Sequence, residues 1–168
     1  MTPEAWLRGP VAGIPPHLMP AAHALLQCRE ELAAAATGLT KAQLWARPGG
    51  AASIGFHLRH VAGSLDRLLT YARGEALTDG QRRAAGTEAT PGEDGEPSAL
   101  LAGVSAAVDA ALAQLRATEV ATLLEPRGVG RAALPSTVLG LLFHAAEHAQ
   151  RHTGQVIATA KVVRNVGT

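Results

Sequence analysis

The sequence predicts an all-α protein, a bundle of four helices around a core of small side chains. Alanine, leucine and valine dominate the 168 residues and aromatic residues make up only 3%, so the core must form by close helix packing and not around large rings. Four segments of about 18 to 28 residues carry helix formers, most with apolar residues at alternating spacings of three and four. The length suits one domain spanning residues 1–168.

The first two long helices are predicted from their end signals. A proline-punctuated N-terminal arm, residues 1–19, precedes a helix that is expected to end at Gly38, because glycine is favoured just after a helix C-terminus. A short helical turn is expected within 40–48. Ser53 can then cap a second helix that runs to about Arg73. Its apolar stripe consists of Ile54, Leu58, Val61, Leu65, Leu68 and Ala72.

The second half of the chain begins with a long polar connection. Residues 74–97 are rich in glycine and proline and lack apolar periodicity, so we expect a mobile loop or a crossover between the second and third helices. A crossover would allow those two helices to run parallel. The third helix is expected over 98–117, and the fourth from Pro135 or Ser136 to about Arg164.

Charge and cysteine content narrow the possible functions. The net charge of +1 is spread without blocks, which argues against a nucleic-acid partner. No stretch approaches the roughly 20 apolar residues of a membrane span, and the N-terminus lacks a signal pattern. Cys28 is the single cysteine, so we expect a reducing cytoplasm. Charged residues of the second helix are expected to form a solvated face with pairs along the helix: Arg59, Arg67, Arg73 and Asp66.

Histidines concentrate in the fourth helix. The stretch "HAAEHAQRH" places His144, His148 and His152 one turn apart from one another along a helix. His148 and His152 continue the spacing of Leu141 and Ala145, so they take positions that an apolar residue would normally occupy. A buried imidazole must be hydrogen-bonded, face a cavity or bind an ion.

A metal ion is the chemistry that best explains this concentration. Two imidazoles one helical turn apart can reach one ion, and "HLRH" in the second helix offers His57 or His60 as a third ligand. The alternative to a metal site is that these histidines are ordinary surface or hydrogen-bonded residues. A helical wheel places His57 nearer the apolar stripe than His60, so the spacing leaves the choice open. His17 and His23 lie outside the pattern.

Three segments resemble a known family. "LTKAQLWARPGG", "SIGFHLRHVAGSLDRLLTYARG" and "HAAEHAQRHTGQVI" are similar to the signature regions of the DinB-like superfamily of metal-binding four-helix bundles, and the likeness covers residues 20–74 and 135–165. The resemblance implies an up-down-down-up helix order. It also implies a divalent metal held by His60, which precedes Val61, and by His148 and His152. His57 and His144 are then reserve ligands or outer partners of the ligands.

The family pattern is not followed everywhere. Family members usually carry Glu directly after the first histidine of the fourth helix, but this chain has Ala149 there, and the nearest acid is Glu147. A carboxylate base at the family position is therefore not expected. "HAAEH" also matches the H-x-x-E-H of inverted zinc peptidases, with His144 and His148 as ligands and Glu147 as base. That reading leaves His152 and the second helix unexplained.

Three imidazoles leave at least one coordination position open, as catalytic sites do. The resemblance implies transferases and isomerases that depend on low-molecular-weight thiols, or metal hydrolases. We therefore expect a metal-dependent enzyme acting on a small molecule, with transfer of a small thiol to an electrophile ahead of hydrolysis. The alternative is a non-catalytic metal-binding or stress-response protein whose metal is structural. Zinc, nickel, iron or copper suits the donors, and relatives that pair suggest a homodimer.

Overall fold

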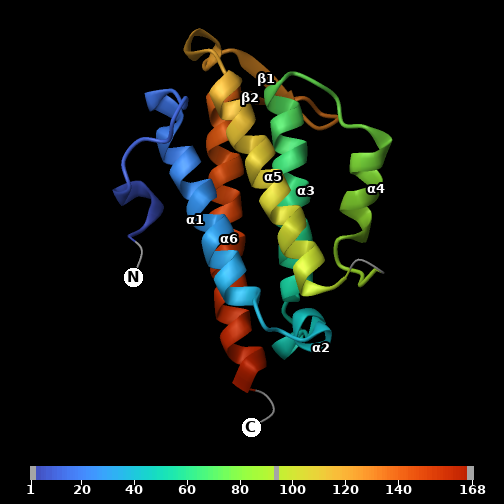
Figure 1. Ribbon diagram of the computed structural model, residues 1–168. Helices are drawn as coiled ribbons and strands as arrows, with labels where there is room; N and C mark the ends of the chain where they lie inside the picture. The colour runs from blue at the N-terminus through green and yellow to red at the C-terminus, as the bar shows by residue number, and fades with distance from the viewer. Residues whose placement is uncertain (1–2, 93–94, 166–168) are drawn as a thin grey trace.

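The computed structural model describes residues 3–92 and 95–165 and is mainly helical (Figure 1). Four long helices correspond to the four predicted ones: α1 (Met19–Ala36), α3 (Ile54–Ala72), α5 (Pro97–Ala117) and α6 (Val138–Asn165). The shorter helices are η1 (Ala5–Leu7), η2 (Pro16–Leu18), α2 (Lys41–Trp45), η3 (Pro48–Gly50), α4 (Asp79–Thr87) and η4 (Val120–Thr122). The predicted all-α class is confirmed, and the ends of the long helices fall within three residues of their predicted positions.

The long helices pack side by side around one core. α3 and α1 each contact both α6 and α5 (Figure 1). The core consists of aliphatic and small side chains, as the composition predicts, and includes Leu25, Leu58, Leu65, Val104 and Leu142. Ser53 caps α3 as predicted, because its hydroxyl oxygen accepts a hydrogen bond from the Phe56 amide. This cap fixes where α3 begins, and therefore which of its residues face α6.

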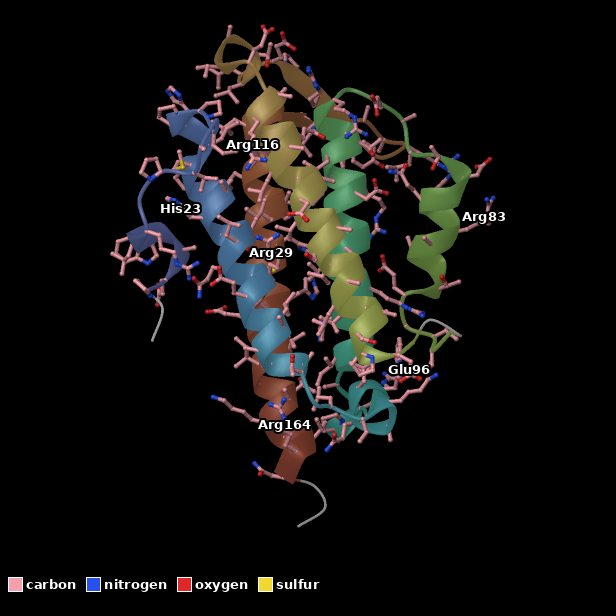
Figure 2. The ribbon with its side chains drawn as sticks, viewed as in Figure 1. His23, Arg29, Arg83, Glu96, Arg116 and Arg164 are labelled. Carbon is pink, nitrogen blue, oxygen red and sulfur yellow. The ribbon has the colours of Figure 1, made fainter. Side chains whose placement is uncertain are left out.

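The N-terminal arm is held on the outside of the helices. The ring Nε2 of His23 lies 2.9 Å from the Gly9 carbonyl oxygen, and the Arg116 side chain donates to the Ala12 carbonyl (Figure 2). Arg29 of α1 pairs with Asp109 of α5 at 2.7 Å. Residues 1 and 2 of the predicted arm lie outside the described residues. The arm is therefore attached to α1 and α5 through its backbone carbonyls and through the Arg8–Glu30 ion pair, away from α3 and its histidines.

The predicted loop over 74–97 contains a helix, so that prediction was wrong in part. Thr78 and Gln81 form a capping box, in which each side chain bonds the backbone N–H of the other. This box starts α4 even though α4 has no buried residue and no large apolar side chain from which a buried face could be predicted. α4 packs beside α3 (Figure 1). Residues 93 and 94 of the same segment lie outside the described residues.

A β-hairpin replaces the loop that was predicted before α6. Strands β1 (Pro126–Val129) and β2 (Leu134–Thr137) pair antiparallel. Each strand has four residues and contains a proline, so a sequence pattern gives little strand signal. The pairing of β2 also explains why α6 begins at Val138 and not at Pro135 or Ser136, since those two residues belong to the ladder.

One expectation about membranes needs correction. Among the described helices, α5 is long and apolar enough to cross a membrane by length and composition, whereas no such segment was predicted. Its large side chains, Leu100, Val104 and Val108, are buried in the core. Alanines on its exposed face raise the mean hydropathy further. Packing against α3 and α1 accounts for the apolar character of α5.

Candidate metal centre

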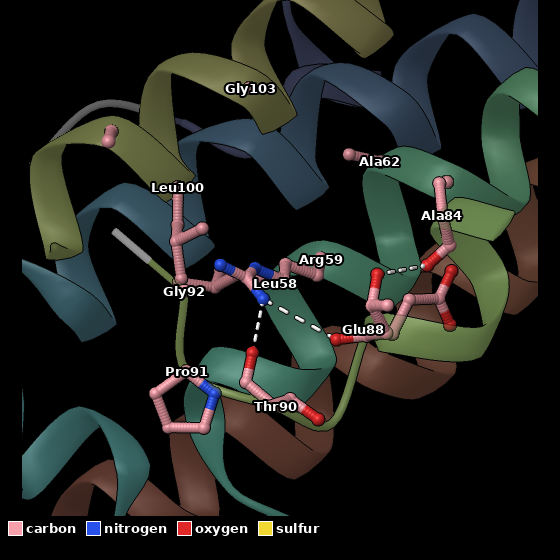
Figure 3. Close-up of a pocket in the computed structure, with 13 residues that line it drawn as sticks. Leu58, Arg59, Ala62, Ala84, Glu88, Thr90, Pro91, Gly92, Leu100 and Gly103 are labelled. Atoms are coloured by element: carbon pink, nitrogen blue, oxygen red, sulfur yellow. Dashed lines mark hydrogen bonds between the residues drawn. The ribbon is translucent and has the colours of Figure 1, made fainter. Parts of the chain in front are cut away.

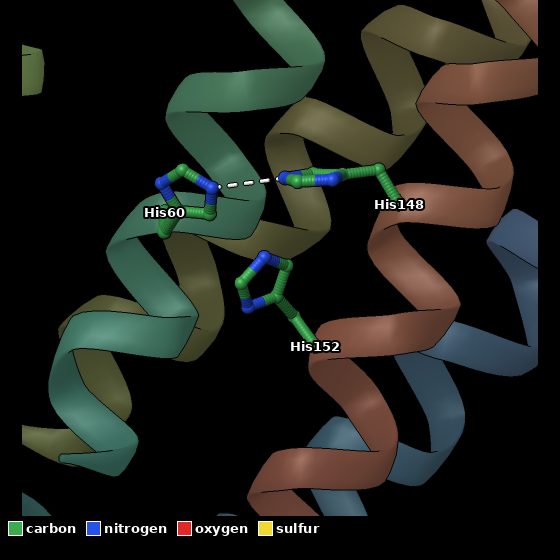
Figure 4. Close-up of side chains that lie close together, drawn as sticks. All are labelled: His60, His148 and His152. Atoms are coloured by element: carbon green, nitrogen blue, oxygen red, sulfur yellow. Dashed lines mark hydrogen bonds between the residues drawn. The ribbon is translucent and has the colours of Figure 1, made fainter. Parts of the chain in front are cut away.

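Three histidines from two helices meet between α3 and α6. His60 of α3 faces His148 and His152 of α6, and the three rings point toward one another (Figure 4). One ring nitrogen of each lies within 4.8 Å of the other two. The Nε2 atoms of His60 and His148 are 2.9 Å apart, a spacing at which a proton or a cation must separate the two lone pairs. The structure thus brings together the three residues that the resemblance named.

The local sequence explains the close approach. His148 and His152 lie one turn apart on the same face of α6, with ring centroids 4.6 Å apart. The α6 residues around them that face the core are small: Ala145, Ala146 and Ala149. Ala149 is fully buried, and its carbonyl lies against the Cys28 thiol. A glutamate at this fully buried position would have to bury its carboxylate, which disfavours glutamate here.

A carboxylate supports His60 from outside the predicted site. Oε2 of Glu88 lies 2.7 Å from Nδ1 of His60, and Oε1 accepts a hydrogen bond from Arg67 at 2.8 Å. Burial alone would raise the pKa of Glu88, but the hydrogen bonds to His60 and Arg67 outweigh it and hold the pKa below its usual value. Glu88 follows α4 directly. Because Glu88 lies in a polar segment, nothing in the sequence marked it as a site residue. The capping box does predict α4, the helix that ends next to Glu88.

Arg67 and Gly63 complete the surroundings of Glu88. Arg67 was predicted on a solvated face, but its side chain is mostly buried and pairs with Glu88, so that prediction was wrong. A Cβ atom at Gly63 would lie 2.6 Å from Oε1 of Glu88 and 2.8 Å from the Arg67 guanidinium. The missing side chain at Gly63 therefore makes room for the ion pair.

His57 lies deeper than His60. Its side chain is almost fully buried, with the residue 5% exposed, in agreement with the helical wheel. Its Nδ1 is 2.9 Å from Nδ1 of His152, so His57 contacts one member of the three-histidine cluster. Burial, and secondarily the nearby His60, lower the pKa of His57. His57 is thus placed as a neighbour of His152.

His144 and Glu147 face outward. Nδ1 of His144 is 3.2 Å from the Glu147 carboxylate, and both side chains are well exposed. Arg151 also pairs with Glu147, and this pairing holds the pKa of Glu147 below its usual value. The H-x-x-E-H reading needs Glu147 directed at a metal-bound water. The observed contacts commit that carboxylate to Arg151 and His144 instead.

The two histidines of the cluster on α6 favour the neutral form. Burial, reinforced by His60 and the other neighbouring imidazoles, lowers the pKa of His148 and lowers that of His152 to about 4. Neutral imidazole is the form that binds a metal. Phe56 stacks on the His60 ring at 5.3 Å between centroids. Within the described residues, Nδ1 of His148 is buried and has no hydrogen-bond partner. Three nitrogen donors directed at one point fit a divalent cation.

A family model of the DinB superfamily matches residues 24–156, which include all three histidines and Glu88. The chain belongs to the DinB superfamily. The resemblance seen in the sequence is thereby confirmed, and it extends across α4 and the hairpin, where no likeness was predicted. A search among curated proteins finds no match. Membership of the DinB superfamily and the three-histidine cluster together fit a metal-binding protein.

A cavity lies on the far side of Glu88 from the histidines. It has a volume of about 580 Å³ and lies between α3, α4, α5 and the segment after α4 (Figure 3). Leu58, Ala62 and Leu100 contribute apolar walls, and Glu88 forms part of the lining. The three histidines do not line it. Glu88 therefore stands between the cavity and the cluster.

Proposed function

We propose that this protein binds one divalent metal ion through His60, His148 and His152. The observation that carries the proposal is the convergence of three ring nitrogens from two helices within 4.8 Å. The lowered pKa values of His148 and His152 support it, because both donors are then neutral at pH 7. Zinc, nickel and iron all suit three imidazoles. His57 and His144 are reserve positions.

We further propose that the site is catalytic, acting on a small-molecule substrate by transfer of a low-molecular-weight thiol, with hydrolysis second. An ion held by three imidazoles supplies a Lewis acid that lowers the pKa of a bound water or thiol. The partial exposure of all three histidines supports this, because a substrate can reach them. Glu88 is committed to His60 and Arg67, so we assign it no role as a general base.

The helix order and the assembly also remain proposals. We infer an up-down-down-up bundle in one domain, because α3 and α5 both start at the end of the molecule where α2 lies, whereas α1 ends there (Figure 1). Segment 74–97 is then the crossover. We propose a cytoplasmic homodimer without nucleic-acid partners. Exposed apolar side chains such as Leu134 and Phe143 support a paired state.

Metal analysis and turnover separate the two functions. The protein is purified without a nickel column, its bound metal is measured, and small thiols are assayed with electrophiles and hydrolysable esters. Stoichiometric metal and thiol-dependent turnover that disappears on chelation would establish the enzyme. Stoichiometric metal without turnover, and with a melting temperature that collapses on chelation, would establish a structural metal that braces α3 and α6.

A further inference from the structure

We propose that Glu88 is a positioning residue of the metal site, which holds His60 with the Nε2 lone pair directed toward His148 and His152. The inference rests on the ligand set of the proposed function. It adds a residue from the connection between α3 and α5, a part of the chain with no histidine.

The contact dictates which nitrogen of His60 carries a proton. An ionised carboxylate only accepts hydrogen bonds, so Nδ1 of His60, 2.7 Å from Oε2 of Glu88, must donate. In the neutral ring Nε2 is then unprotonated, and Nε2 is the atom that faces His148. Carboxylate partners of this kind orient metal-binding histidines and raise their basicity.

The segment that carries Glu88 is anchored to α3 on both sides of the carboxylate. Arg59 of α3 donates to the carbonyl oxygens of Thr87 and Thr90, which flank Glu88 in sequence (Figure 3). Arg67 holds the second carboxylate oxygen, and Gly63 leaves the space for both. Glu88 itself is only 7% exposed. Several independent contacts therefore fix the position of the Glu88 carboxylate, and its position does not rely on the hydrogen bond to His60 alone.

The three histidines differ in this respect. Nδ1 of His152 faces another imidazole, that of His57, and Nδ1 of His148 has no partner within the described residues. Among the described residues, His60 is the member of the cluster whose second nitrogen meets a carboxylate. Removing that carboxylate should therefore weaken metal binding without removing a ligand.

The test compares two glutamates that both contact a histidine. Glu88→Gln keeps the size of the side chain but replaces an acceptor-only carboxylate by an amide. Glu147→Gln makes the same change beside the exposed His144. Zn²⁺ affinity is measured by competition with a chelator. We expect Glu88→Gln to bind Zn²⁺ about 10 to 100-fold more weakly, and Glu147→Gln to stay within about twofold of the unmodified protein. Equal affinities for the two variants would overturn the proposal.

A second measurement keeps the test independent of folding and of the proposed function. Long-range ¹H–¹⁵N NMR of the metal-free, unmodified protein at pH 8 reports the tautomer of His60. A proton on Nδ1 supports the proposal, and a proton on Nε2 overturns it, whether or not Glu88→Gln folds. If the unmodified protein takes up no Zn²⁺, the proposed function fails, and the tautomer still decides the role of Glu88.

Discussion

The two sides of the histidine cluster are built in different ways. On α6, one helix supplies both His148 and His152, and their spacing alone aligns them. On α3, His60 depends on Glu88, which lies 28 residues later in the chain. Donors repeated along one helix are thus placed by local geometry, whereas the orientation of a single donor needs a contact made by tertiary structure.

The difference also appears in how each ring is satisfied. His60 has a carboxylate on Nδ1 and a stacked phenyl ring, while Nδ1 of His148 is buried and has no hydrogen-bond partner in the part of the chain that the structure describes. If His60 keeps its proton on Nδ1, the short contact between the two Nε2 atoms requires His148 to donate in the metal-free protein. His148 must then move its proton when a cation binds, whereas His60 is already prepared.

Removing a ligand should have the largest effect. We expect His152→Ala to weaken Zn²⁺ binding by more than about 100-fold, beyond the loss that an outer partner causes. His144→Ala, on the same helix but exposed, should leave most of the affinity. Elemental analysis of both variants after equilibration with zinc checks this. Full zinc loading of His152→Ala would show that the ligand set is wrong.

Filling the space beside Glu88 should have the next largest effect. Gly63→Ala on α3 drives a methyl group into the Glu88–Arg67 pair, so we expect a loss of about 1–3 kcal/mol in unfolding free energy and weaker Zn²⁺ binding. Gly154→Ala on α6 meets nothing within 4 Å and should stabilise the helix by about 0.5–1 kcal/mol. Urea unfolding and chelator competition measure both. Equal changes in unfolding free energy and Zn²⁺ affinity in the two variants would contradict the proposed difference between the α3 and α6 sides of the cluster.

The pH dependence of the metal-free protein tests the α6 side. The folded pKa of His152 is about 4, below the value of about 6.5 in an unfolded chain. Between these values the unfolded state binds more protons, so the unfolding free energy falls as pH is lowered from about 6.5 toward 4. Urea unfolding at pH 7.5 and 5 should show a smaller fall in His152→Asn than in the unmodified protein. Equal falls would contradict the lowered pKa of His152.

The cap of α4 should have the smallest effect on the site. Thr78→Ala removes a capping box worth about 1 kcal/mol, so amide hydrogen exchange over 79–87 should speed up. Because 1 kcal/mol corresponds to a factor of about 5, Zn²⁺ affinity should fall by no more than this. Thr40→Ala, which removes the equivalent cap of α2, should leave the exchange of α4 unchanged. A large loss of affinity in Thr40→Ala would show that caps act on the whole fold.

Much of the fold follows from local signals. Ser53 and Gly38 predicted helix ends, and the apolar stripe of α3 predicted the face that is buried. The spacing of His148 and His152 predicted that they share a face of α6. The family resemblance, and not the wheel, selected His60, because the cluster lies beside the core stripe and not on it.

What could not be predicted depends on contacts between distant residues. In the sequence, Glu88 and Arg67 look like ordinary surface charges. They become a buried ion pair only when α4 packs against α3. α4 has no large apolar side chain, and the hairpin strands are short and contain prolines, so neither shows a pattern of large apolar residues. The spacing of Thr78 and Gln81 fits a capping box and is a local signal for α4, whereas the glycines and prolines around it favour a loop.

X-ray absorption at the zinc edge of the loaded protein tests the central claim most directly, because it counts imidazole ligands. We predict one zinc per chain with three imidazole nitrogens at about 2.0–2.1 Å and at least one further ligand that is not imidazole. Zinc that does not bind, or that binds with fewer than two imidazoles, would contradict the account.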